Sequence, residues 1–420
     1  MADTENPVSV VAASQEDYLS AFAPLREPLY RNLWIAAVIS YTGTWMHNLG
    51  TGWLMTSLTT SPMLVGLVQA AISLPVFLVI LPAGALADMA DRRRLLLVTQ
   101  AWMVVVAATL GILTIYGMVT PGVLLLLTFL LGLGAVMNDP AWQAIIPEVA
   151  SHQRLPQAVA LNSAGFNIAR AVGPAIGGLI IAATSSGVAF LLNAASFFGV
   201  ILFLHRWKRV HHDIPVPLNS IVDSMKAGLD HLRQSPPVQS VLVRSGLFSV
   251  FASGMWSMLP LIARPHGSIG FGFLLGSFGF GALLGAGVLP LLRRVASLNT
   301  LVTVATAVFA MITAALAYLQ AFPALCGTLL VGGLAWIVIL ASLNLSAQTM
   351  SPPWLRARSL SMYLLVLQGG LAVGSAMWGG VAEHFSMAVA LLAAATGLML
   401  GLTAVRRHPL RVGAIVSPVP

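Results

Sequence analysis

The chain has 420 residues, of which 58% are hydrophobic and only 8% are charged, and its net charge is +8. This composition excludes an ordinary water-soluble domain, in which about 25% of the residues are charged. The basic residues are dispersed along the chain and form no single patch, so the net charge does not indicate nucleic-acid binding.

Twelve apolar stretches are each long enough to cross a membrane, because a hydrocarbon core of about 30 Å needs about 20 apolar helical residues. We therefore expect an all-α integral membrane protein. The first six crossings are predicted at 32–55, 63–86, 96–117, 122–145, 157–183 and 187–205. The second six are predicted at 239–262, 270–291, 300–319, 323–347, 359–382 and 387–405.

The basic residues lie in alternate gaps between these crossings. All of the 21 Arg and Lys residues, except Arg170, Arg244 and Arg264, fall in the two tails or in every second gap. Loops rich in Arg and Lys stay in the cytoplasm. This distribution predicts that both termini are cytoplasmic and that the loop containing Arg264 lies outside.

The longest polar stretch divides the crossings into two sets of six. We expect a cytoplasmic tail over 1–31, a six-helix half over 32–205, a linker over 206–238, a second half over 239–405 and a tail over 406–420. Within the linker, apolar residues recur at helical spacing from Ile221 to Leu232. This helix lies either along the membrane surface or on the cytoplasmic face of the protein itself.

The gap after the second crossing, 84–95, resembles the signature loop of major facilitator transporters. Met89 and Asp91 depart from the family pattern, and the matching residues are Gly84, Asp88, Arg92 and Arg93. An aspartate here favours the positive N-terminus of a neighbouring helix. The resemblance implies that this loop, joined by Asp139, locks the outward-open state. The alternative is a loop that only anchors the chain to the cytoplasmic side.

A group of small residues surrounds a proline in the fifth crossing. It resembles a motif of major facilitator antiporters that export drugs and metabolites, although Ala169 replaces the upstream glycine of that motif. The matching residues are Gly173, Pro174, Gly177 and Gly178. Small residues allow helices to approach closely and proline bends a helix, so a role in packing alone is the alternative.

Five further segments, at 25–34, 43–46, 58–62, 139–148 and 160–170, resemble the branch of this superfamily that includes the enterobactin exporter and bacterial secretion permeases. The resemblance implies an exporter of a small hydrophobic or siderophore-like molecule in the bacterial inner membrane. It also implies proton antiport. We further expect a monomer in contact with membrane lipid, and no cofactor or metal ion.

Other classes of function have little support in the sequence. There is no phosphate-binding loop, no metalloprotease motif and no hydrolase nucleophile motif, so we do not expect an enzyme. An uptake permease of the same fold remains the main alternative. A membrane enzyme and a sensor that does not transport are the remaining ones.

Charged groups within the hydrocarbon are functional candidates by default. Asp139 lies within the fourth crossing, Arg170 lies deep in the fifth, and Glu383 sits at the outer end of the eleventh. Because a guanidinium keeps its charge, Arg170 needs a partner, either Asp139 or an anionic part of the substrate; Arg92 is the other candidate partner of Asp139. The predicted substrate or proton pathway comprises His47, Asn48, Asn138, Asp139, Asn162, Asn167, Arg170, Asn344 and Gln368. Since helices 1, 4, 7 and 10 line the cavity in this family, His47, Asn138 and Asn344 are the favoured wall residues.

Overall fold

The computed structural model describes residues 22–89, 91–207, 235–350, 356–405 and 410, and the described part is helical. The predicted linker helix and most of both tails lie outside these residues. The first half contains η1 (Ala23–Arg26), α2 (Pro28–Leu58), α3 (Pro62–Met89), α4 (Arg92–Ile115), α5 (Pro121–Val149), η2 (His152–Arg154), α6 (Leu155–Ala183) and α7 (Ser186–Arg206). The second half contains α9 (Pro236–Ala263), η4 (Arg264–His266), α10 (Gly267–Val295), α11 (Leu298–Ala315), α12 (Phe322–Thr349), α13 (Arg356–His384) and α14 (Met387–Ala404).

Each of the twelve predicted crossings coincides with one long helix, which confirms the predicted fold class. By length and hydropathy alone, ten stretches of the described chain qualify as membrane spans, and one of these, Pro236–Val295, contains both α9 and α10. The helix that does not qualify is α2, which carries His47 and Asn48 near its middle. Because His47 is buried inside the protein, α2 can be less apolar than a helix that faces lipid on all sides.

Hydroxyl and carboxyl side chains fix where several helices begin. Asp91 accepts a hydrogen bond from the backbone N–H of Arg94 at the start of α4. Ser185 and Ser386 cap α7 and α14 in the same way. Such caps satisfy N–H groups that have no partner within the helix, which matters most where a helix enters an apolar medium.

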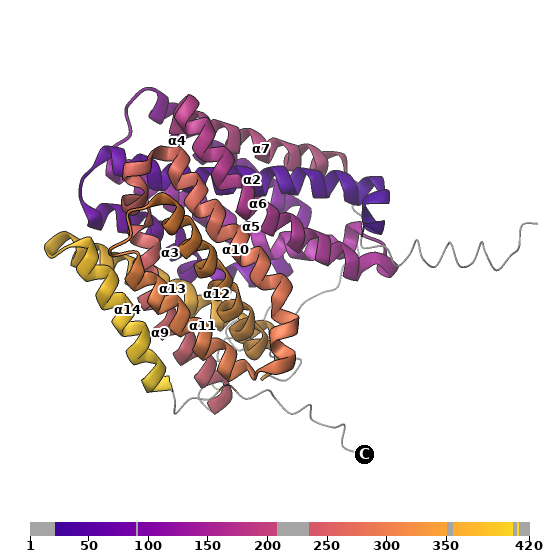
Figure 1. Ribbon diagram of the computed structural model, residues 1–420. Helices are drawn as coiled ribbons and strands as arrows, with labels where there is room; N and C mark the ends of the chain where they lie inside the picture. The colour runs from indigo at the N-terminus through magenta and orange to yellow at the C-terminus, as the bar shows by residue number, and fades with distance from the viewer. Residues whose placement is uncertain (1–21, 90, 208–234, 351–355, 406–409, 411–420) are drawn as a thin grey trace, which may run out of the picture.

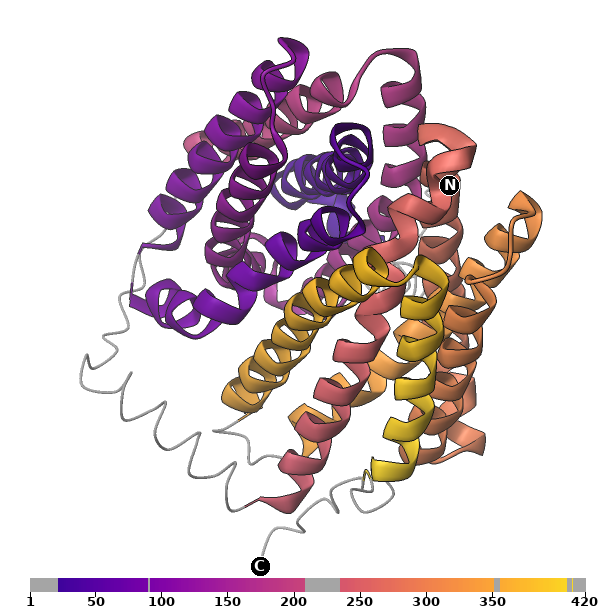
Figure 2. The same cartoon turned by 90° about the vertical axis from the view of Figure 1, so that its left-hand side faces the viewer.

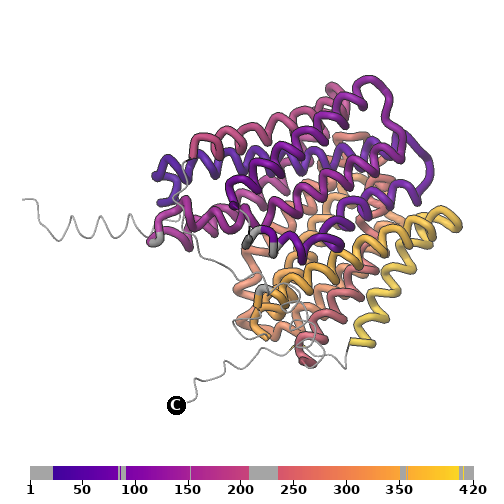
Figure 3. Tube along the Cα trace, turned by 180° about the vertical axis from the view of Figure 1, so that it is seen from behind, coloured from indigo at the N-terminus to yellow at the C-terminus, as the bar shows by residue number. Residues whose placement is uncertain are grey.

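The two halves lie against each other along two pairs of helices. Helix α3 packs along α13, and α6 packs along α10. Figures 1 and 3 show the first half, indigo to magenta, lying over the second half, orange to yellow. The ligand-sized space described below lies between these halves.

Glycines bring the two halves together at one end of the bundle. A Cβ atom on Gly178 of α6 would lie 2.5 Å from the carbonyl oxygen of Ser268 and 3.2 Å from the Cα of Gly272, both on α10. A Cβ on Gly66 of α3 would lie 3.2 Å from the Cα of Gly379 on α13. We call this the closed end; α3 and α10 begin there, and α6 and α13 end there.

The halves separate toward the opposite end, which we call the open end (Figure 2). Along α10, Gly276 and Gly279 still approach Ala171 of α6, whereas a Cβ on Gly287, three turns after Gly276 on the same face, would meet nothing within 4 Å. At this end of α5, Asp139 is exposed. The space between the halves is therefore accessible from the open end and shut at the closed end.

Candidate functional site

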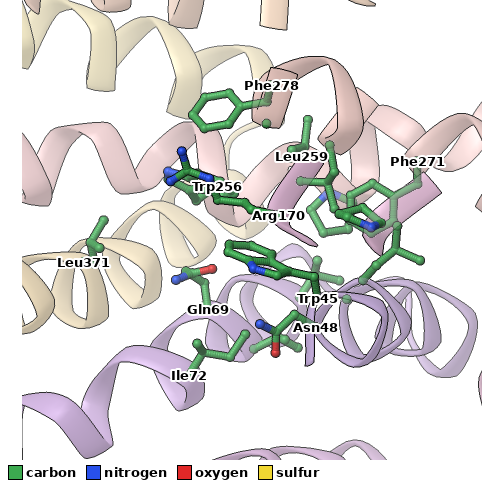
Figure 4. A pocket seen from close by; sticks show the side chains of 18 of the residues that line it. Trp45, Asn48, Gln69, Ile72, Arg170, Trp256, Leu259, Phe271, Phe278 and Leu371 are labelled. Carbon is green, nitrogen blue, oxygen red and sulfur yellow. The ribbon is translucent and has the colours of Figure 1, made fainter. Parts of the chain in front are cut away.

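A cavity lies between the two halves, near the middle of the bundle (Figure 4). Its empty volume is about 1050 Å³, part of which is open to solvent. Helices α2, α3 and α6 supply one wall, and α9, α10, α12 and α13 supply the other. Because both halves contribute, a bound molecule would contact both halves at once.

The wall from the second half is mainly aromatic. Trp256, Phe278 and Trp336 pack against one another, with ring centroids 4.9 Å apart for Trp256 and Phe278, 5.5 Å for Trp256 and Trp336, and 6.1 Å for Phe278 and Trp336. All three pairs have the edge-to-face geometry that aromatic rings prefer. These contacts hold the rings in place and leave an apolar surface for a ligand.

The first half contributes most of the polar groups. Asn48 and Gln69 line the cavity from α2 and α3, and the Gln69 amide donates a hydrogen bond to the hydroxyl of Ser73 on its own helix. Arg170 of α6 is the charged residue among those that line the cavity. Figure 4 shows its side chain extending into the space between Phe278 and Gln69.

Two nitrogens of the Arg170 guanidinium have no partner among the residues that the structure describes. Nε and Nη2 are buried, and neither forms a hydrogen bond within the described part of the chain. No ion pair joins Arg170 to Asp139 among the described residues, so the first of the two predicted partners is absent from this conformation. A buried guanidinium without partners is unfavourable, which makes Arg170 the least satisfied group of the cavity.

Close backbone contacts fix the position of Arg170. A Cβ on Gly279 of α10 would lie 2.8 Å from the Arg170 carbonyl oxygen, and a Cβ on Gly173 would lie 2.8 Å from Cβ of Trp45 on α2. Small residues on both sides therefore hold this turn of α6 between α2 and α10. The charged side chain is presented from a rigid backbone.

The residues of the antiporter-like motif face three different surroundings: α2, α10 and the cavity. Gly173 and Gly177 pack against α2 within the first half, and Gly178 packs against α10 of the second half at the closed end. Pro174 lines the cavity itself. A single stretch of α6 thus connects the cavity to the contact that closes it.

The basic residues of the signature-like loop contact the first half. Arg92 donates to the Glu148 carboxylate at 2.8 Å and to the Ala144 carbonyl oxygen at 3.3 Å, both on α5. Arg93 donates to the carbonyl oxygens of Leu204 and His205 at the end of α7. These bonds join helix ends of one half. Gly84 and Asp88 lie in the last turns of α3, where the surroundings of Gly84 and the side chain of Asp88 are outside the described part of the structure.

Asp139 does not pair with Arg92, which differs from the prediction. Glu148 takes that position because it lies about 13 Å further along α5, at about 1.5 Å per residue, and so reaches the start of α4. Asp139 forms no hydrogen bond or ion pair with any described residue. It is exposed at the open end, near Tyr41.

Of the predicted pathway residues, Asn48 and Arg170 line the cavity, and the others lie elsewhere. His47 is buried against Phe190, with ring centroids 4.5 Å apart. Asn138 accepts hydrogen bonds from Gln100 and Thr99 of α4. Each remaining amide that hydrogen-bonds does so within its own half: Asn162 with Tyr41, Asn167 with the Ser163 carbonyl, and Asn344 with Gln348. Gln368 is partly buried and is not part of the cavity wall.

Two features of the site are not among the site residues predicted from the sequence. One comprises Gln69 and the aromatic wall; in the sequence, Gln69 stands out only as a polar residue within an otherwise apolar second crossing. The other is a contact of Glu383 with Ser61 and Met63, which joins α13 to the start of α3. No local pattern marks that contact, because its residues are more than 300 positions apart.

The chain matches the family described as transmembrane secretion effector over residues 19–417. It is 29% identical over 202 residues to the staphyloferrin A transporter of Staphylococcus aureus, a match that covers 46% of this chain and 51% of that protein. It is 25% identical over 241 residues to the enterobactin exporter EntS of Shigella boydii, covering 56% of each. The chain thus spans about half the length of these curated relatives.

Solved structures share the fold. A bacterial homologue of the human lysosomal transporter Spinster superposes with a TM-score of 0.71 at 14% identity, over 94% of this chain and 99% of that one. The family match extends along nearly the whole sequence, and the structure has two six-helix halves with a cavity between them. These findings agree on one family. The chain belongs to the transmembrane secretion effector family of major facilitator superfamily transporters, and it is not an enzyme.

Proposed function

We propose that this protein exports a small hydrophobic or siderophore-like molecule by proton-coupled alternating access. The observation that carries the proposal is the cavity between the halves, shut at the closed end and accessible from the open end. Under the orientation that the basic residues predict, the open end faces the cytoplasm. An exporter must load its substrate from that side, and the relative named as the enterobactin exporter supports this direction.

Asp139 is the group we propose for proton coupling. A coupled antiporter needs a group that gains and loses a proton as the site alternates, and a carboxylate held in a fixed ion pair is poorly suited to that role. Asp139 has no such partner among the described residues, and it is exposed at the open end. Of the other two candidates, His47 is enclosed against Phe190 away from the cavity, and Glu383 accepts hydrogen bonds from Ser61 and Met63 at the closed end.

Inside-out membrane vesicles test the direction and the coupling. We expect vesicles that contain the protein to accumulate a labelled siderophore when the lumen is acidified, and to lose it when a protonophore collapses the gradient. Vesicles without the protein are the control. Accumulation only in right-side-out vesicles would identify an uptake permease and contradict the proposal.

The predicted orientation has its own test. Single cysteines replacing Arg264 or Arg206, in a chain with Cys326 replaced by serine, report which side each residue faces. We expect a membrane-impermeant thiol reagent to label the position at 264 from outside intact cells and the position at 206 only after permeabilisation. The reverse pattern would place the open end outside. We also propose that the transporter works as a monomer in the bacterial inner membrane.

A further inference from the structure

The cavity combines features that together select one class of ligand. An aromatic wall faces a wall that carries one cation and two amides, and the described lining contains no acidic residue. This is a concave site with a few convergent polar groups, which is typical of small-molecule pockets. The charge pattern is the informative part, because it distinguishes anionic from cationic compounds.

Arg170 is the group that requires an anion. Its Nε and Nη2 atoms are buried without a hydrogen-bond partner, and no ion pair with a carboxylate compensates its charge among the described residues. These two nitrogens lie on one edge of the guanidinium, the geometry that binds both oxygens of a carboxylate. Loading an anionic ligand would supply both missing bonds at once.

The wall opposite Arg170 offers an apolar surface for the uncharged part of the ligand. Trp256, Phe278 and Trp336 form a packed aromatic surface, and Phe271 of α10 extends it. Trp45 of α2 adds an apolar surface on the wall that carries Arg170. Arg170, Trp256 and Phe278 line the same cavity (Figure 4). An anionic head at Arg170 would therefore place an attached ring against this wall. Asn48 and Gln69 remain for hydroxyl or carbonyl groups of the ligand.

We infer that the transported molecule is an organic anion, an aromatic or apolar body carrying a carboxylate or similar acidic group that binds Arg170. That the bound anion is also the transported molecule rests on the proposed function. It excludes the lipophilic cations that a cavity lined by an acidic residue would attract. Because Arg170 also lies beside the contacts of α6 with α10, its ligand would engage the helix pair that closes the site.

A series of probes that share one ring and differ in charge tests the inference. The purified full chain in lipid nanodiscs is incubated with tritiated 2-naphthoate, and unlabelled 2-naphthoate, 2-naphthamide and 2-naphthyltrimethylammonium compete for binding. We expect the carboxylate to bind at least about tenfold more tightly than the amide, since hydrogen bonds to charged groups are among the stronger polar contacts. The cation should bind least.

Substitutions test whether Arg170 causes the preference for the carboxylate probe. Arg170→Gln should reduce the affinity for naphthoate to that of the amide, and Arg170→Lys should restore only part of it because the forked geometry is lost. Arg264→Gln removes one exposed arginine outside the cavity and should change nothing. A preference that survives in Arg170→Gln would place the anion site elsewhere and overturn the inference.

The wild-type series decides the question even if a variant fails to fold. Equal binding of the three probes, tighter binding of the cation, or no binding of naphthoate would each overturn the inference. These binding measurements need no pH gradient, and their result does not depend on the direction of transport. An anion preference without vesicle export would therefore reject the proposed function alone, and export without an anion preference would reject this inference alone.

Discussion

The carboxylate of Glu383 accepts a hydrogen bond of 2.7 Å from the hydroxyl of Ser61, across the interface between the two halves. It also accepts one of 3.2 Å from the backbone N–H of Met63. Ser61 and Met63 flank the first residue of α3, so the negative charge of α13 lies at the positive end of that helix. This contact fastens the closed end where α3 and α13 meet.

We expect loss of this contact to favour the conformation in which the closed end opens. Glu383→Ala removes both hydrogen bonds and the charge at the helix end, while Glu383→Gln keeps an acceptor and should have the smaller effect. Distance distributions between spin labels on the exposed ends of the two halves measure the two populations. Ser61→Ala is the matched control and should reproduce part of the shift. Unchanged distributions in Glu383→Ala would show that the contact is incidental.

The glycines of the interface make a second prediction, with a control on the same helix. A Cβ on Gly272 would lie 2.6 Å from the Pro174 carbonyl oxygen, so Gly272→Ala must push α6 and α10 apart at the closed end. Gly287→Ala adds the same atom where nothing lies within 4 Å. We expect Gly272→Ala to slow transport severalfold while Gly287→Ala transports normally. Equal rates in the two variants would mean that α10 does not need this approach to close.

The fold was predictable because its signals are local. A crossing is recognised from some 20 consecutive apolar residues, and its orientation is predicted from the charges beside it. Arg170 was identified for a similar reason, since a charge within a crossing stands out without knowledge of its neighbours. Each of these inferences needs only a short window of sequence.

The direction in which a side chain points was less predictable. His47 and Asn48 are adjacent, yet Asn48 lines the cavity and His47 lies against Phe190, because consecutive helical residues point about 100° apart. Arg92 pairs with Glu148 and not with Asp139 because of how far α4 and α5 are shifted along each other, and the sequence does not specify that shift. The bond of Ser61 to Glu383 depends on how two halves dock, and only the assembled structure shows it.

The pair of Arg92 and Glu148 gives a prediction about stability. It lies within the first half, and its side chains are 33% and 22% exposed. We expect Arg92→Gln and Glu148→Gln each to lower thermal stability slightly, with a coupling of about 0.5–1 kcal/mol in the double-mutant cycle, as for partly exposed ion pairs. The balance between the two conformations should not move. A large conformational shift in Arg92→Gln would instead support the lock that the family resemblance implies.

Asp139 offers the most direct test of coupling. If its carboxylate carries the proton, Asp139→Asn should still exchange labelled substrate across the membrane but should no longer concentrate it in response to a pH gradient. The amide preserves the shape of the side chain while removing its titration, and the absence of any described ion pair means that no partner is left unbalanced. His47→Gln is the control, because His47 is enclosed away from the cavity and should leave gradient-driven transport intact. Proteoliposomes with a defined internal pH separate exchange from accumulation. If Asp139→Asn still accumulates substrate and His47→Gln does not, the histidine is the proton carrier, and its enclosure must open during the cycle.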